Sequence, residues 1–173
     1  MMKEIEEHEI EKEISSLVEK FYSENGKERK EAREELVKIG RPAIDYLEEL
    51  EHSDEQIVRW EAIKTLSEIA DPIATPIFVN ALEDDDSEIR WLAAEGIINI
   101  GQPALEELFV ALINNPDSME LRKGAHHVLR KLIEQNRYKD YYGIQEKLYG
   151  NPKESGISPV AEAALKILKH RKV

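Results

Sequence analysis

The chain has 173 residues, of which 41% are hydrophobic and 35% are charged, and it contains no Cys. The lack of Cys excludes disulfides and thiol-based catalysis, and no apolar stretch approaches the ~18 residues that a membrane-spanning helix needs. The first residues also lack the apolar segment of a secretory signal, so we expect a cytoplasmic protein without a membrane contact.

The net charge of −12 is unevenly distributed along the chain. Residues 1–118 carry 12 basic and 30 acidic side chains, whereas residues 119–173 carry 12 basic and 6 acidic ones. The acidic part would repel a phosphate backbone, which argues against nucleic acid as the main partner. Opposite charge at the two ends also predicts a weak head-to-tail self-association that salt would screen.

The first predicted element is a helix over residues 3–22. Ile10, Ile14, Leu17 and Phe21 recur there at the spacing of one helical face. We expect this helix to pair with a longer one over residues 27–39 and to cap one end of the domain.

A four-residue frame then recurs about every 31 residues. In each copy an Arg is followed by an Ala after three residues, by an aliphatic residue after four more, and by another after a further three. The copies are Arg29–Ala32–Leu36–Ile39, Arg59–Ala62–Leu66–Ile69, Arg90–Ala93–Ile97–Ile100 and Arg122–Ala125–Leu129–Leu132. A fixed period of this length indicates stacked helical hairpins, and the clear repeats cover residues 25–135.

Pro, Gly and capping residues mark the predicted helix boundaries. Pro42, Pro72 and Pro103 each predict the first turn of a shorter helix, where a missing N–H costs nothing. Gly40 and Gly101 fit the left-handed position that ends a helix. The starts of the long helices are predicted by four capping pairs, namely Asn25 with Glu28, Ser53 with Gln56, Asp85 with Glu88, and Asp117 with Glu120.

Residues 137–171 are predicted to form a final hairpin that caps the other end. Its helices would cover residues 138–149 and about 160–169, with a loop at 151–158. The segment also places Tyr138, Tyr141, Tyr142 and Tyr149 among Arg137, Lys139 and Lys147. Such a mixture can stack on single-stranded nucleic acid, although a terminal cap also needs aromatic bulk, and we favour the cap. The chain 1–173 is thus predicted to be one all-α domain of ten helices in about five hairpins.

The segments 58–76 and 89–104 resemble the HEAT-like repeat of the phycobilisome-lyase type. This resemblance implies a right-handed α-α superhelix whose Arg-bearing helices line the concave face. It also implies that Arg59, Arg90 and Arg122 bond to the turn acids Asp54, Asp85 and Asp117 and so hold the repeats in register. Repeats of this type occur in scaffolds, chromophore lyases, a hydroxylase and DNA-binding repair proteins, so the resemblance does not select a function.

The sequence offers little support for catalysis. The related iron-dependent hydroxylase is built from His-Glu dipeptides on its repeats, but here the one such dipeptide, His8-Glu9, lies outside the clear repeats. His126 and His127 are adjacent on a helix and point about 100° apart, so they do not chelate one metal ion together. We therefore expect no metal, no cofactor and no enzymatic activity.

Trp60 and Trp91 are the two Trp residues of the chain, and each directly follows the Arg of its repeat. Helical geometry directs Trp60 away from Ala62 and the core, toward the concave groove. The pair is either an anchor for a bound peptide or a part of the packing between repeats. The predicted partner-binding residues are Trp60, Trp91, Lys64, Glu95, Ile98, Lys123 and His127.

The function predicted from these features is a non-catalytic scaffold that binds an unidentified peptide or protein segment. Two alternatives stay open at this stage. One is a nucleic-acid-binding protein that uses the basic C-terminal third, and the other is a lyase or hydroxylase of the resembling family.

Overall fold

The computed structural model describes residues 2–135, 139–149 and 156–171, without the side chains of residues 2–6, 149, 170 and 171. Within these ranges the chain forms ten α-helices and four short 3-10 helices, and no strand. The predicted all-α class and the stacked helical hairpins are therefore confirmed.

The α-helices pair in chain order into five hairpins. Their bounds are α1 (Met2–Glu19), α2 (Gly26–Ile39), α3 (Ile44–Glu51), α4 (Gln56–Ile69), α5 (Thr75–Ala81), α6 (Ser87–Ile100), α7 (Gln102–Asn114), α8 (Met119–Glu134), α9 (Tyr142–Tyr149) and α11 (Ile157–Arg171). The 3-10 helices are η1 (Lys20–Tyr22), η2 (Arg41–Ala43), η3 (Pro72–Ala74) and η4 (Lys139–Tyr141).

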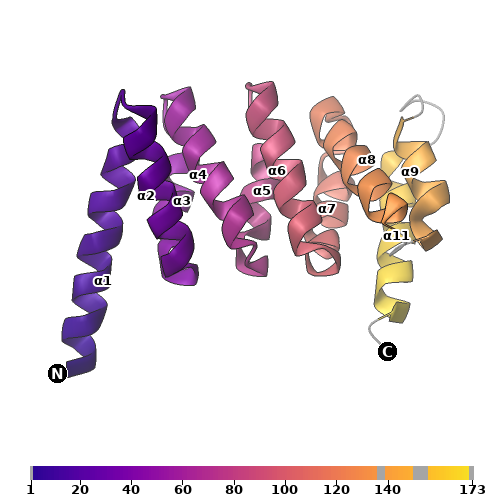
Figure 1. Cartoon of the computed structure of the whole chain (residues 1–173). Coiled ribbons are helices and arrows are strands. Elements are labelled where there is room, and N and C mark those ends of the chain that lie inside the picture. Colours follow the sequence, from indigo (N-terminus) through magenta and orange to yellow (C-terminus); the bar gives the residue numbers. More distant parts are fainter. Residues whose placement is uncertain (1, 136–138, 150–155, 172–173) are drawn as a thin grey trace.

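The hairpins stack side by side into a two-layered array (Figure 1). One layer, here the front layer, contains α2, α4, α6 and α8, each in contact with the next. The rear layer contains α1, α3, α5, α7 and α11 in the same succession. Each hairpin thus buries its apolar surface against its neighbours, as expected for a solenoid.

The recurring Ala and first aliphatic residue of the frame form the centre of the core between the two layers. Ala32, Ala62, Ala93 and Ala125 are all buried, and so are Leu36, Leu66, Ile97 and Leu129. Small residues at these places let neighbouring helices approach closely. Gly96 is the extreme case, since a Cβ there would lie 2.4 Å from the Phe78 ring of α5.

The predicted helix ends agree with the backbone. Gly40 ends α2 with φ at 73°, and Gly101 ends α6 with φ at 77°. At the equivalent end of α4 the chain carries Ala70, which takes the left-handed conformation with φ at 53°. The three Pro residues lie in first turns, with Pro42 in η2, Pro72 in η3 and Pro103 in α7.

The predicted helix starts are correct at one of four long helices. Asn25 caps α2 by accepting from the Lys27 amide at 3.0 Å. The caps of α6 and α8 are Asp86 and Ser118, one residue later than predicted in each case. The residue at the start of α4 is Glu55, which makes no side-chain capping bond. Each correction has the same cause, because several adjacent capping residues precede these helices.

The C-terminal hairpin forms as predicted, with α11 beginning three residues earlier than expected from Val160. Tyr141 is buried and packs on Phe109 of α7, with ring centroids 5.6 Å apart. Most of the predicted loop at 151–158 lies outside the described residues, as does Tyr138.

Candidate functional site

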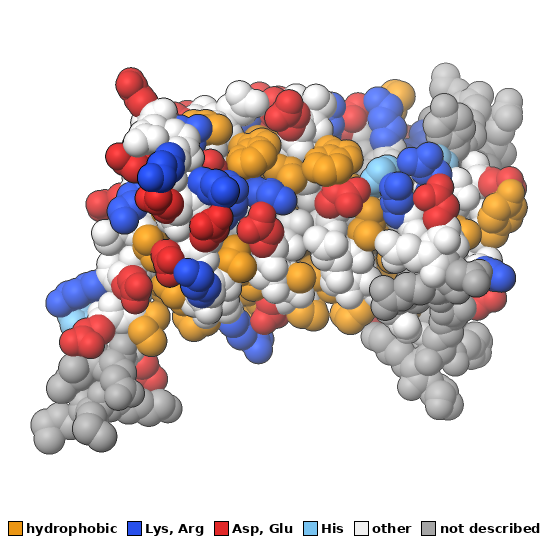
Figure 2. All heavy atoms as spheres, viewed as in Figure 1, with side chains coloured by type: hydrophobic (Ala, Val, Ile, Leu, Met, Phe, Trp, Pro, Cys, Tyr) orange, Lys and Arg blue, Asp and Glu red, His pale blue; other side chains and the backbone are white. Residues whose placement is uncertain are grey.

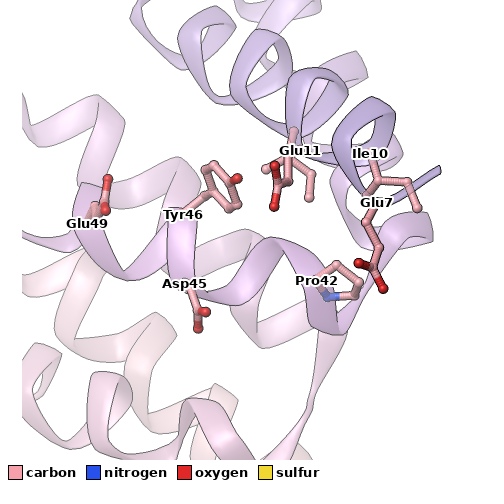
Figure 3. Close-up of a pocket in the computed structure, with 8 residues that line it drawn as sticks. Glu7, Ile10, Glu11, Pro42, Asp45, Tyr46 and Glu49 are labelled. Atoms are coloured by element: carbon pink, nitrogen blue, oxygen red, sulfur yellow. The ribbon is translucent and has the colours of Figure 1, made fainter. Parts of the chain in front are cut away.

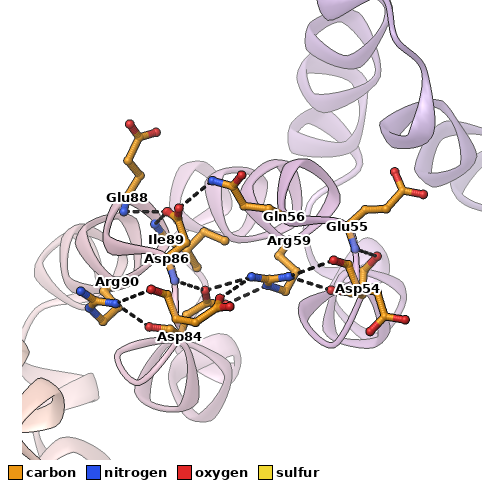
Figure 4. A network of polar contacts seen from close by, with 11 residues as sticks. Asp54, Glu55, Gln56, Arg59, Asp84, Asp86, Glu88, Ile89 and Arg90 are labelled. Carbon is orange, nitrogen blue, oxygen red and sulfur yellow. Dashed lines mark hydrogen bonds and ion pairs between the residues drawn. The ribbon is translucent and has the colours of Figure 1, made fainter.

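The Arg of each repeat first secures its own helix to the preceding turn. In three repeats, Nη1 donates to the carbonyl oxygen six residues earlier. Arg29 reaches Ser23 at 2.7 Å and Arg59 reaches Ser53 at 3.0 Å. Arg90 reaches Asp84 at 2.7 Å (Figure 4). These bonds satisfy carbonyl groups of the polar turns and fix where each long helix begins.

The same Arg side chains also bind an acid of the next repeat. Arg29 pairs with Glu61 at 3.2 Å, and Arg90 pairs with Glu120 at 3.2 Å. Arg59 pairs with Asp84 at 2.9 Å and with Asp85 at 2.6 Å. The Arg series therefore joins consecutive hairpins, which assigns it to the architecture.

The predicted bonds from Arg59 to Asp54 and from Arg90 to Asp85 form, but through the backbone of these acids and not through their carboxylates. Asp54 and Asp85 offer backbone carbonyl oxygens to Arg59 and Arg90, and the pairing carboxylates come from the following turn or helix. Arg122 is buried and donates to the Leu148 carbonyl at 3.1 Å, so its predicted bond to Asp117 is replaced by one to α9.

Two carboxyl groups near this network have shifted pKa values of opposite sign. Burial raises the pKa of Asp84, but the hydrogen bonds from Arg59 and from the Asp86 amide outweigh it, so the net pKa is lowered. At Glu51, burial raises the pKa from 4.5 to about 7, with added repulsion from Glu48 and Asp84. The ionised carboxylate is thus stabilised at Asp84, in the turn between α5 and α6, and disfavoured at Glu51, the last residue of α3.

The two Trp side chains occupy equivalent places in the repeat but have different surroundings. Trp91 on α6 is 55% exposed. Trp60 on α4 is half-buried against the core, and the Arg33 guanidinium lies over its ring at 5.7 Å from the centroid. One ring is therefore held by a cation–π contact, while the other stays open to solvent.

Arg33 was not among the residues predicted from the sequence. It bonds to the buried carboxylate of Glu61 and lies 3.7 Å from Glu68, which holds it in front of Trp60. Its position could have indicated this role, because Arg33 follows Arg29 by four residues and therefore lies on the same face of α2, the face that meets α4.

The front-layer surface is hollowed on both sides of the Trp pair. A hollow of about 360 Å³ between α2 and α4 is lined by Lys30, Arg33, Ile57 and Trp60, among others. A hollow of about 160 Å³ between α6 and α8 is lined by Trp91, Ala94, Lys123 and His127, among others. Figure 2 shows hydrophobic side chains over α4 and α6 on this face, with charged side chains around them.

The charged residues predicted for the groove form pairs along this face. His127 lies 3.0 Å from Glu95, Lys123 lies 2.8 Å from Glu120, and Lys64 lies 3.1 Å from Glu68. Each of these three side chains thus has an acidic partner on this face.

Ile98 is a correction to the predicted set. Its side chain is 6% exposed and belongs to the core. The physical reason is its place in α6 next to Ile97, where the helix is covered on both of these faces by neighbouring hairpins.

His126 and His127 contact different neighbours. His126 lies 2.8 Å from the Gln145 side chain of α9, and burial, with repulsion from Arg130 and His127, lowers its pKa. In the described part of the chain, no group of three or more His, Asp or Glu side chains is placed to hold a metal ion.

The aromatic and basic C-terminal segment divides between core and surface. Tyr141 is in the core, and Tyr142 is exposed. With Tyr141 packed on Phe109, the described part of this segment presents a single aromatic ring to solvent rather than a stacking platform.

Comparison with known proteins finds a similar repeat and a similar fold. Residues 14–98 match the family of HEAT repeats. A chain from the complex of CpcE and CpcF of phycocyanin lyase from Nostoc sp. PCC7120 has a similar fold, with a TM-score of 0.56 and 24% identity over 88% of this chain and 97% of that one. No curated protein shows significant similarity to the chain.

These findings confirm the resemblance noted in the sequence at the level of the repeat and the fold. The stack of helical hairpins continues beyond the matched residues, since α7 to α11 repeat the hairpin arrangement. Among the described helices, none is both long and apolar enough to cross a membrane.

Proposed function

We propose that this chain is a non-catalytic scaffold that binds a protein segment on its front layer, with the exposed ring of Trp91 as the main anchor. The observation that carries the proposal is the 55% exposure of this Trp. Covering a large apolar ring removes it from water, which makes binding more favourable. Trp is also enriched among the residues that dominate binding energy. HEAT repeats, present in residues 14–98, are compatible with such a role.

The surroundings of Trp91 suit an apolar anchor with a polar rim. The neighbouring hollow is lined by the small residues Ala94 and Gly124 and by the polar side chains of Lys123 and His127. The Lys123 ammonium and the His127 ring already have acidic partners, Glu120 and Glu95. A bound segment can therefore cover the indole without leaving a buried charge unpaired.

The shape of the front layer favours a segment lying on the surface over an enclosed small molecule. Its two hollows measure about 360 and 160 Å³, at or below the low end of typical ligand pockets. A chromophore lyase would need an enclosing cavity for its chromophore. That the similar solved chain is part of a two-protein complex supports a protein as the partner class. A cytoplasmic location remains a prediction.

The proposal is tested by selecting peptides from a displayed random library on the intact protein and measuring their affinity by fluorescence anisotropy. We expect Trp91→Ala to weaken binding of the selected peptides by at least tenfold, which is the effect of a hot-spot residue. The matched control is Ile73→Ala, which truncates a comparably exposed apolar side chain in η3, outside the front layer. It should leave the affinity unchanged.

Equal affinity for the wild type and Trp91→Ala would contradict the proposal, and so would equal losses in both variants. If the protein instead binds single-stranded DNA in a parallel assay and selects no peptide, that result would favour the alternative role for the basic C-terminal third.

A further inference from the structure

A third hollow lies between the first two rear-layer helices, α1 and α3, away from the Trp surface. It has a volume of about 530 Å³ (Figure 3). It is lined by Glu7, Ile10, Glu11, Ile14, Pro42, Asp45, Tyr46 and Glu49. Ile14 is buried and belongs to the core, while Ile10 is 40% exposed. Apolar surface that remains exposed to solvent at the end of a repeat array is a surface that a partner can cover.

The rim of this hollow is acidic on both sides. Glu7 and Glu11 come from α1, and Asp45 and Glu49 come from α3 (Figure 3). No Lys or Arg is among the described residues that line it, and the His8 ring lies 3.6 Å from Glu11. This combination suits the side chains of Lys and Arg, whose apolar stems can cover the floor while their charged ends meet the rim.

The opposite end of the same chain offers the complementary surface. A hollow of about 340 Å³ between α9 and α11 is lined by Ile144, Lys147, Pro159, Val160, Ala163 and Ile167, together with Gly143 and Asp140. Lys166 and Lys169, also on α11, are exposed. Residues 119–173 as a whole carry 12 basic and 6 acidic side chains.

The positions of the two ends allow one copy to meet the next. Figure 1 shows that α1 and α11 stand at opposite ends of the array and that both extend beyond the helices between them on the same side. Both also belong to the rear layer, because α1 contacts α3 and α11 contacts α7. A second copy placed end-on therefore continues the rear layer and brings its α11 next to α1.

We propose that the α1–α3 hollow binds the basic α9–α11 end of a second copy of this chain. The contact is heterologous, since each copy uses a different surface, and it leaves one acidic and one basic end free. Association therefore proceeds to open chains rather than to a closed dimer. Because the charges are exposed, salt screens the attraction.

Sedimentation velocity of the full chain over a range of concentrations tests this proposal. At about 0.01 M salt, where screening acts over about 30 Å, the mean sedimentation coefficient should rise with concentration, and at about 1 M it should stay that of a monomer. Asp45→Lys with Glu49→Lys reverses the acidic rim and should abolish the rise. Lys147→Glu with Lys166→Glu reverses the basic end and should abolish it too. Circular dichroism confirms that each variant keeps its helices.

The decisive arm is a mixture of the two reversed variants. Their ends are again complementary between the two proteins, so association should return on mixing. Glu24→Lys with Glu107→Lys is the control, because both side chains are exposed, lie outside the two hollows and give the same charge change as the acidic-rim variant. It should associate like the wild type. A monomeric wild type at low salt would overturn the proposal, as would a mixture that stays monomeric or a control that fails equally.

Discussion

The guanidinium of Arg59 binds both carboxylate oxygens of Asp84, with Nε–Oδ2 at 2.9 Å and Nη2–Oδ1 at 3.2 Å. The two side chains are 13% and 9% exposed. They belong to consecutive hairpins, so this bidentate pair connects α4 to the turn that precedes α6. Its geometry depends on the planar fork of Arg, which Lys does not reproduce.

Arg59→Lys should therefore lower the free energy of unfolding by about 1–3 kcal/mol, because it leaves part of a buried carboxylate without a donor. Urea denaturation followed by circular dichroism measures it. Arg41→Lys is the matched control, since its side chain is 68% exposed and lies 3.8 Å from Asp71. That change should stay within about 0.5 kcal/mol. Equal effects at the two positions would show that the Arg59 pair contributes no more than a surface contact.

Glu51 should make the protein less stable as the pH rises. Burial raises its pKa from 4.5 to about 7 in the folded chain, so the folded state favours the protonated form. The associated stability is fully present below pH 4.5 and is lost as the pH rises through 7. Glu51→Gln should thus raise the unfolding free energy by about 1–3 kcal/mol at pH 8 and leave it nearly unchanged at pH 4.

Denaturation curves at the two pH values test the Glu51 prediction. Glu107→Gln, at an exposed position on α7, serves as the control and should show no such difference. A Glu51→Gln variant with the same gain at pH 4 and pH 8 would rule out the titration as its cause.

Ala70→Gly should stabilise the protein by about 0.5–1 kcal/mol. Ala70 has φ at 53°, a left-handed conformation that costs an L-residue about 1 kcal/mol and Gly much less. The reverse change, Gly40→Ala, should destabilise by at least about 1 kcal/mol. The nearest atom to a Cβ at Gly40 would be the Val37 carbonyl oxygen at 4.0 Å, so backbone strain alone acts there. Thermal melts of both variants measure the pair, and a destabilised Ala70→Gly would contradict the strain argument.

The two Trp→Ala variants should differ in stability. Trp60→Ala should cost about 1–2 kcal/mol, because it removes a half-buried ring and its contact with Arg33. Trp91→Ala should change the unfolding free energy by no more than about 0.5 kcal/mol, as for other surface positions. A core-sized cost of about 3–5 kcal/mol at Trp91 would mean that the ring is structural.

The repeat frame is visible in the sequence because burial imposes it at every copy. Ala62 and Leu66 recur where two layers meet, and their equivalents are buried throughout. The helix starts are less predictable. Asp84, Asp85 and Asp86 are adjacent and all suit a cap, but Asp84 and Asp85 bind Arg59, which leaves Asp86 to cap α6. Arg59 and Asp84 are 25 residues apart in the chain, so a local sequence pattern does not predict their contact.

The same limit applies to the candidate site. Trp60 and Trp91 follow equivalent Arg residues, so the sequence treats them alike. Their difference comes from Arg33, which covers Trp60 and whose counterpart thirty residues later is the buried Ile63. The burial of Ile98 was likewise not predicted, because helical spacing within α6 does not show which of its faces the neighbouring hairpins cover.

The most direct test of the proposed function is the fluorescence of Trp91 alone, in a Trp60→Phe protein, with and without a selected peptide. An indole that is 55% exposed should emit at long wavelength and be quenched readily by acrylamide. We predict that a saturating peptide shifts the emission to shorter wavelength and protects it from the quencher. Emission that stays red-shifted and fully quenchable with the peptide bound would contradict the assignment of Trp91 as the anchor.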